Sequence, residues 1–214
     1  MKDEILRRIR ETGVVPVVRA ESASEALAVV EAIRAGGISI LEITMTVPGA
    51  IEVIRQLVSR LAPEVTIGAG TVIETQQARD CITAGAQFIV APSLNLEVIA
   101  LCQQQNVPVF PGALTPTEVV TAWQAGADIV KVFPCGSVGG AKYLRALKAP
   151  FPQIELMPTG GVTLETAADF IRAGAAALGV GADLVDVKAI RSGQPEKVTR
   201  AAAAYIETVR TART

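Results

Sequence analysis

The sequence predicts an α/β protein, a single (β/α)8 TIM barrel with a short extra helix at its N-terminus. Three observations predict this fold. Eight short apolar runs alternate with longer stretches of helical period, glycines recur where those stretches end, and 214 residues, half of them apolar, are ample for one large core. No linker or low-complexity segment is evident, so we expect one domain over residues 1–214.

The eight apolar runs are the expected strands. They lie at residues 14–19, 40–45, 66–72, 88–93, 108–114, 129–135, 154–161 and 176–181. An open doubly wound sheet is the alternative arrangement. We prefer the barrel because the runs number eight and because no G-x-G-x-x-G pattern follows any of them.

The stretches between the runs are the expected helices, because they place apolar residues at i, i+3, i+4 and i+7. Start signals agree: Ser22 and Ser24 precede Glu25, and Pro116 stands where a first helical turn would begin. Glycine is the expected residue past a helix C-terminus. Ala-Gly pairs precede four of the runs, at residues 35–36, 84–85, 125–126 and 173–174.

Both ends of the chain also have a helical pattern. Residues 1–13 form a short amphipathic segment, and residues 195–212 provide the eighth helix of the barrel. Trp123 falls in a helical stretch, and we expect it to pack between that helix and a neighbour.

Composition argues against several classes of partner. The net charge is −1 and the basic residues are scattered, which argues against nucleic acid or an anionic membrane as the main partner. No apolar run approaches the roughly 18 residues that a membrane span needs. The N-terminal segment contains acidic residues, so it does not resemble a signal peptide. Three cysteines without C-x-x-C spacing indicate reduced thiols and a cytoplasmic protein.

The chain contains no histidine, and this absence limits its chemistry. Every nucleophile that depends on a Ser-His or Cys-His pair is excluded. A metal site would need carboxylates and thiolates alone, so we expect no metal. Acid–base chemistry must then use Glu, Asp, Lys, Tyr or Cys.

A lysine interrupts one of the expected buried strands, and a glutamate interrupts another. Strand side chains alternate between the barrel interior and the helical layer, so Lys131 and Glu42 both project inwards if their apolar neighbours pack under the helices. Arg19 ends the first run and Thr71 lies near the end of the third. Active sites of this fold form at the C-terminal ends of the strands, so these four residues are candidates.

A buried lysine is costly unless it is paired or neutral. Burial lowers a lysine pKa, and a neutral amine can attack a ketone to form a Schiff base, so Lys131 is a candidate nucleophile. Glu42 could transfer the protons that such chemistry requires. No cofactor is then needed, because the protonated imine is itself the electron sink. The structural alternatives are a Lys131–carboxylate pair and an ion pair between Glu42 and Arg19.

Glycines follow the seventh and eighth runs, in the segments 158–162 and 179–183. Barrel enzymes often bind phosphate in these loops, through backbone N–H groups at a helix start. Gly160, Gly161 and Gly181 would let the backbone approach an anion closely. The same glycines could equally serve as turn residues.

Several motifs, in this order, resemble the bacterial class I aldolases for 2-keto-3-deoxy-6-phosphogluconate (KDPG) and 4-hydroxy-2-oxoglutarate (KHG). The similarity runs from about residue 10 to the end. The motifs are PVVRA (16–20), LEITMTVPGA (41–50), GAGTV (68–72), VAPSL (90–94), PGALTPTE (111–118), KVFP (131–134), PTGGV (158–162) and GVGADLV (179–185).

The resemblance implies a role for each candidate residue. Lys131 resembles the Schiff-base lysine of a K-x-F-P motif, and Glu42 the general acid/base of L-E-x-T. Arg19 and Thr71 would hold the carboxylate of the pyruvate moiety. Pro92 and Phe133 would line the pocket. The phosphate would lie against the backbone of Gly160, Gly161, Gly181 and Ala182.

The resemblance also implies a (β/α)8 barrel, usually a homotrimer, that acts on a small 2-keto acid without a cofactor. One residue departs from the family pattern. Many members have serine where this chain has Ala182, and Asp183 follows it. Losing a hydrogen bond to a charged group costs about 1.5–3 kcal/mol, and the neighbouring carboxylate would repel phosphate. The unphosphorylated substrate KHG and a galactonate-derived analogue therefore stay open.

Two rival functions remain at this point. A phosphosugar isomerase or epimerase of similar barrel shape would typically need paired inward carboxylates or a metal, and a second inward carboxylate is not evident. A barrel that only binds an anion, or that only assembles into an oligomer, is the non-enzymatic alternative.

Overall fold

A computed structural model describes residues 2–214. All of the paired strands are parallel. The strands are β1 (Val14–Val18), β2 (Ile40–Thr44), β3 (Thr66–Gly70), β4 (Ile89–Val90), β5 (Val109–Phe110), β6 (Gly112–Ala113), β7 (Val130–Val132), β8 (Leu156–Pro158) and β9 (Leu178–Val180). Each of the eight predicted runs contains a strand, and the fifth run contains both β5 and β6, on either side of Pro111.

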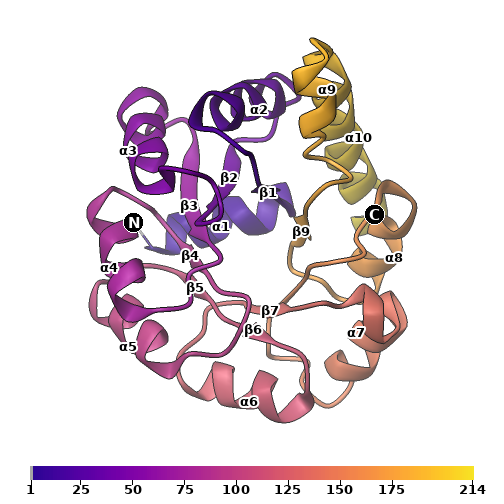
Figure 1. Cartoon of the computed structure of the whole chain (residues 1–214). Helices are drawn as coiled ribbons and strands as arrows, with labels where there is room; N and C mark the ends of the chain where they lie inside the picture. Colours follow the sequence, from indigo (N-terminus) through magenta and orange to yellow (C-terminus); the bar gives the residue numbers. More distant parts are fainter. Residues whose placement is uncertain (1) are drawn as a thin grey trace.

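Except for the first, the helices follow the strands and surround them on the outside (Figure 1). They are α1 (Lys2–Thr12), α2 (Ala23–Ala35), α3 (Ala50–Leu61), α4 (Thr75–Thr83), α5 (Leu96–Gln104), α6 (Pro116–Gln124), α7 (Gly140–Lys148), α8 (Leu164–Arg172), α9 (Val187–Arg191) and α10 (Pro195–Arg213), with a 3-10 helix η1 (Gly136–Val138) before α7. The predicted N-terminal helix and the long C-terminal helix are both present. The short helix α9 was not predicted.

The strands form two sheets, in the orders β5-β4-β3-β2-β1-β9 and β6-β7-β8. Proline has no N–H and interrupts the ladder at Pro111, but its carbonyl still accepts a bond from the Lys131 N–H at 2.9 Å. At the other junction, a parallel bridge pairs Thr159 with Gly179. The chain therefore has a TIM-barrel-like α/β fold, with parallel strands surrounded by helices (Figure 1).

Local signals in the sequence explain where helices begin and end. The Ser22 hydroxyl accepts a hydrogen bond from the Glu25 N–H at 3.2 Å, which caps α2. Thr115 and Glu118 form a capping box before α6, and Pro116 takes its first position, as predicted. Gly126 and Gly174, which follow α6 and α8, adopt φ of +99° and +97°, where a side chain would be strained. The prediction for Trp123 is wrong, since 41% of this residue is exposed.

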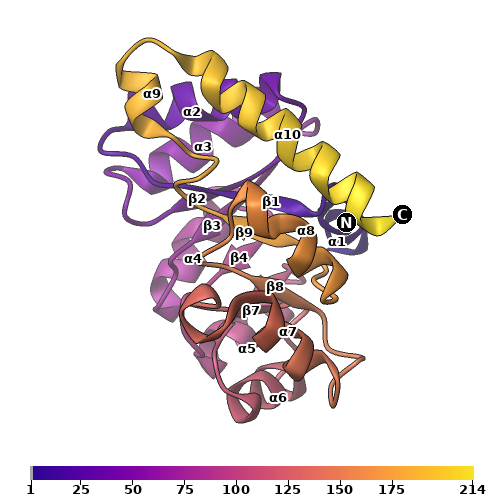
Figure 2. The ribbon, with the colours of Figure 1, turned by 90° about the vertical axis from the view of Figure 1, so that its right-hand side faces the viewer.

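The strands separate two apolar clusters. One cluster lies between the strands and the outer helices, and it contains the β7 residues Val130 and Val132. The other contains the inward-facing Val15, Phe88 and Ile129, together with residues of α1. Helix α1 lies behind the strands in Figure 1, and Figure 2 shows it at the end of the molecule opposite α9. Its apolar face packs across the N-terminal end of the strands, which leaves their C-terminal ends to form a site.

Candidate active site

Lys131 lies in β7 and is almost completely buried, with 3% of its surface exposed. Its neighbours Val130 and Val132 belong to the outer cluster, so the lysine side chain is on the inward face, as the alternation predicted. The amine Nζ lies 5.3 Å from the centre of the Phe133 ring. The strand therefore places an amine at the C-terminal end of the interior, beside an aromatic wall.

Glu42 lies in β2 and is fully buried. Both of its carboxylate oxygens lack a hydrogen-bond partner among residues 2–214, so neither structural alternative, an ion pair to Arg19 or one to Lys131, is formed. Burial raises the pKa of Glu42 above its ordinary value, and the positive charges of Lys131 and Arg19 oppose that shift. Gly70 makes room for the carboxylate, because a Cβ there would lie 1.9 Å from Oε1. A buried, unsatisfied carboxylate is costly, which indicates a functional role.

Glu42→Gln is expected to raise the free energy of unfolding at about pH 8, by about 1–2 kcal/mol. Because the Glu42 pKa is raised in the folded state, the native protein binds this proton more tightly than the unfolded chain does. The resulting stabilisation is complete below the ordinary pKa of 4.5 and is lost as pH rises through the raised value. The neutral amide avoids that loss, so the advantage of the variant should shrink towards pH 4.5.

Urea unfolding of both proteins at the two pH values measures this effect. Glu52→Gln, which changes an exposed carboxylate on α3, is the matched control. A stability difference that does not depend on pH would contradict the raised pKa of Glu42.

Thr71 follows β3 in an unusual backbone conformation. Its φ is +60°, in the left-handed region that β-branched residues rarely adopt. Such strain costs on the order of 1–3 kcal/mol and is found mainly at functional sites. Thr71 also follows Gly70, which packs against Glu42. The strained turn thus comes directly after the glycine that packs against the buried carboxylate.

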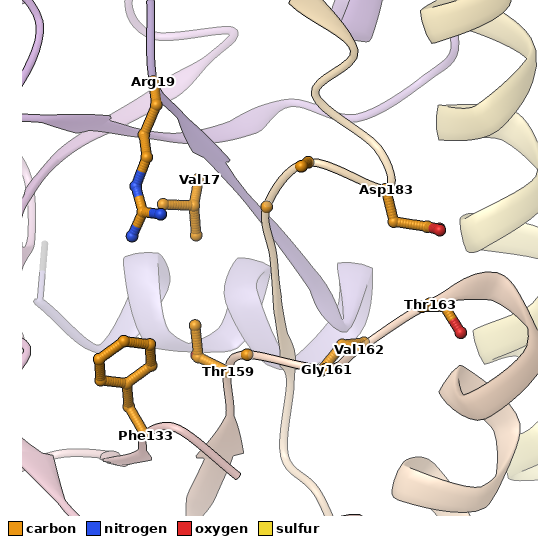
Figure 3. A pocket seen from close by; sticks show the side chains of 11 residues that line it. Val17, Arg19, Phe133, Thr159, Gly161, Val162, Thr163 and Asp183 are labelled. Carbon is orange, nitrogen blue, oxygen red and sulfur yellow. The ribbon is translucent and has the colours of Figure 1, made fainter. Parts of the chain in front are cut away.

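A pocket of about 480 Å³ opens at the C-terminal ends of the strands. Figure 3 shows the guanidinium of Arg19 pointing into it towards Phe133, with Val17 beside the guanidinium and Thr159 beside the ring. Six of the ten predicted site residues line this pocket: Arg19, Phe133, Gly160, Gly161, Gly181 and Ala182. The other four are not in its lining: Lys131, Glu42, Thr71 and Pro92. Of these, Lys131 and Glu42 lie buried in the interior, and Pro92 is half-buried beside Gly112, the strand partner of Lys131.

The glycines of the pocket wall differ in whether the structure could accept a side chain at their positions. Gly160 and Gly161 adopt φ of +81° and +79°, and a Cβ on Gly161 would approach the Gly136 Cα to 2.8 Å. Gly181 has neither constraint, because nothing lies within 4 Å of an added Cβ. Within residues 2–214, the N–H groups of Gly161 and Ala182 donate no bond to another backbone group. These two donors are therefore free to bind an anion in the pocket.

Thr159 is a pocket residue that the sequence analysis missed. It is 4% exposed, it lines the pocket, and its Oγ1 has no partner among the described residues. Gly179 is needed opposite it, because a Cβ there would lie 2.1 Å from that oxygen. Alternation from Met157 places Thr159 on the inward face, so the same argument that found Lys131 could have found it.

The Asp183 carboxylate was expected to repel phosphate, but it is held at the edge of the pocket. Its Oδ2 accepts hydrogen bonds from the Tyr205 hydroxyl at 2.6 Å and from the Leu164 N–H at 3.1 Å. In Figure 3 its side chain points away from Arg19 and Phe133. Two hydrogen bonds therefore fix the direction of this carboxylate, on a residue that is itself exposed.

Residues 2–214 contain no cluster of three or more His, Cys, Asp or Glu side chains suited to a metal ion. No helix of this part of the chain is long and apolar enough to span a membrane. Its three cysteines are free and buried.

The family model described as KDPG and KHG aldolase matches residues 5–201. The chain belongs to this family. A 2-dehydro-3-deoxy-phosphogluconate aldolase of Haemophilus influenzae is 32% identical over 97% of both chains. A 2-dehydro-3-deoxy-6-phosphogalactonate aldolase of Escherichia coli K12 is 37% identical over 92% of this chain and 95% of its own length.

Solved structures of the KDPG and KHG aldolase family share the fold. The KDPG aldolase of Legionella pneumophila, captured with pyruvate as a covalent carbinolamine intermediate, has a TM-score of 0.87. It is 31% identical, and the match covers 94% of this chain and 97% of that one. A carbinolamine requires an amine that attacks a ketone, which is the chemistry that the buried lysine predicted.

Proposed function

We propose that the chain is a class I aldolase, a lyase that cleaves KDPG, KHG or both to pyruvate and an aldehyde. The aldehyde is glyceraldehyde 3-phosphate from KDPG and glyoxylate from KHG. One observation carries the proposal: Lys131 and the unpartnered Glu42 are buried together inside a fold shared with Schiff-base aldolases. Among residues 2–214, Glu42 is the only buried carboxylate, which disfavours an isomerase with paired carboxylates.

Lys131 is the proposed nucleophile. Its nitrogen forms a bond to C2 of the keto acid, and the carbonyl oxygen leaves as water, which gives a protonated imine. When the C4 hydroxyl loses its proton, the C3–C4 bond breaks and the aldehyde departs. The bond electrons pass to the imine as an enamine. Protonation at C3 and hydrolysis then release pyruvate and restore Lys131, with no cofactor or metal.

Glu42 is the proposed acid and base for these proton transfers. Its carboxylate has no hydrogen-bond partner, so both oxygens are free to exchange protons with substrate or water. Burial raises its pKa, which brings the group closer to neutral pH, where acid–base transfer is most effective.

The substrate carboxylate is proposed to bind Arg19 and Thr71. The Arg19 guanidinium points into the pocket, and the strained turn at Thr71 directly follows Gly70, which packs against Glu42. Guanidinium and hydroxyl donors suit a carboxylate. Pro92 and Phe133 would form the walls beside the reacting carbons.

A phosphate would lie between the two glycine loops. Gly160 and Gly161 supply one side, and Gly181 and Ala182 the other, around a pocket wide enough for the anion. The free N–H groups of Gly161 and Ala182 support this placement.

The proposed function is tested by comparing the initial rates at which KDPG, its galactonate isomer and KHG are cleaved, measured by the pyruvate released. No pyruvate from any of the three would overturn it.

Ala182→Ser is expected to lower KM for phosphorylated substrates about tenfold, since an added hydroxyl can donate a bond to phosphate worth about 1.5–3 kcal/mol. KM for KHG should not change. Ala182→Cys, with similar volume and a weaker donor, is the control. An equal change for both classes of substrate would count against this placement of the phosphate.

We propose one domain with a closed (β/α)8 barrel, supported by the bond from Lys131 to Pro111 and by the bridge from Thr159 to Gly179. A homotrimer is proposed from the family resemblance, and a related solved structure is a cage designed from symmetric oligomeric domains. A cytoplasmic location fits the three free cysteines.

A further inference from the structure

A buried tyrosine contacts the wall of the anion pocket from behind. Tyr205 lies in α10 and is completely buried. Its hydroxyl donates to Asp183 Oδ2 at 2.6 Å, and the same oxygen accepts the Leu164 N–H at the start of α8. Hydrogen bonds to a carboxylate are about twice as strong as neutral ones. Two fixed donors therefore set the direction of the Asp183 side chain.

That direction matters because Asp183 is next to the residues that would meet a phosphate. It follows Ala182 in the chain, and it lines the same pocket as Gly161 and Gly181. Figure 3 shows its carboxylate turned away from Arg19 and Phe133, and so away from the pocket centre. A carboxylate released from this position could turn to the free N–H groups of Ala182 and Gly161. It would compete with an anion for those donors and repel it.

We propose that Tyr205 is a positioning residue for substrate specificity, acting through Asp183. Its hydroxyl holds the Asp183 carboxylate out of the anion pocket, so that the chain can bind a phosphorylated keto acid despite an acid in the pocket wall. The inference rests on the proposed function. The reaction centre at Lys131 and Glu42 is not involved, so the effect is confined to the phosphate end of the substrate.

The test compares Tyr205→Phe with the double variant Tyr205→Phe/Asp183→Asn. In Tyr205→Phe, KM for KDPG and the inhibition constant of inorganic phosphate should rise about fivefold or more, with kcat unchanged. KM for KHG should stay within about twofold. The double variant should return the KDPG-to-KHG ratio of KM values to that of the wild type or below it, because the released side chain is then neutral.

Tyr143→Phe is the matched control, since it removes the hydroxyl of the chain's other tyrosine. Tyr143 lies in α7, and its hydroxyl donates a hydrogen bond to the Leu114 carbonyl instead of to Asp183. The inference would be overturned if Tyr205→Phe raised KM for KDPG and KHG alike, or if adding Asp183→Asn did not restore KM for KDPG. Either result would leave the aldolase assignment intact. A wild type that cleaves KHG but neither cleaves KDPG nor binds phosphate would also overturn it. A wild type inactive on every keto acid would instead remove the proposed function.

Discussion

Lys131→Met is expected to lower kcat on the order of 10⁵-fold while the protein stays folded, because methionine has similar volume and no nucleophilic nitrogen. The side chain is almost completely buried between Gly112 and Met157, its strand partners. Methionine should pack there without moving the backbone. Removing a buried amine without a carboxylate partner should also raise the free energy of unfolding, by about 1–3 kcal/mol.

Pyruvate release, circular dichroism and urea unfolding measure these three effects. Lys142→Met, which removes an exposed lysine of α7, is the matched control and should keep full activity. Lys131→Arg separates charge from nucleophilicity, because a guanidinium keeps its proton and cannot form the imine. A folded Lys131→Met protein with substantial turnover would contradict the assignment of this lysine.

Glu42→Gln is expected to lower kcat by about 10² to 10⁴-fold, the usual range for loss of a positioned acid or base. The amide has nearly the same shape and fits beside Gly70, but it cannot accept and return a proton. Because Lys131 is retained, the variant should still form the imine with pyruvate, at a lower rate. The two roles can thus be told apart, because Lys131→Met should abolish imine formation whereas Glu42→Gln should only slow it.

Steady-state kinetics and single-turnover formation of the imine measure these effects. Glu42→Asp, which keeps the acid but shortens the side chain, should recover part of the lost rate. A Glu42→Gln variant with kcat close to that of the wild type would show that protons travel by another route, such as the unpartnered hydroxyl of Thr159.

Periodicity carried most of the fold prediction. A strand repeats every two residues, so apolar neighbours on the outer face were enough to place Lys131 and Glu42 inside. The structure confirms both placements, since Val130 and Val132 pack outside and both charged side chains are buried. Helix starts were equally local, because the Thr115–Glu118 capping box and Pro116 at the first helical position all lie within four consecutive residues.

Contacts between distant residues could not be predicted in this way. The bond between Tyr205 and Asp183 joins residues 22 positions apart, and no local pattern encodes it. The strained φ of Thr71 depends on its surroundings rather than on its own preference. Nor could the amphipathic pattern of α1 say that its apolar face would cover one end of the strands. Trp123 was misplaced because a helical pattern does not show whether a neighbour covers the residue.

The most direct test is reduction with borohydride in the presence of pyruvate, followed by peptide mass spectrometry. A Schiff base is reduced to a stable secondary amine, so the modified peptide identifies the nucleophile. We expect one pyruvate-derived adduct, on Lys131, absent from Lys131→Met and present in Lys142→Met. No adduct, or an adduct on another lysine with turnover intact, would contradict the account.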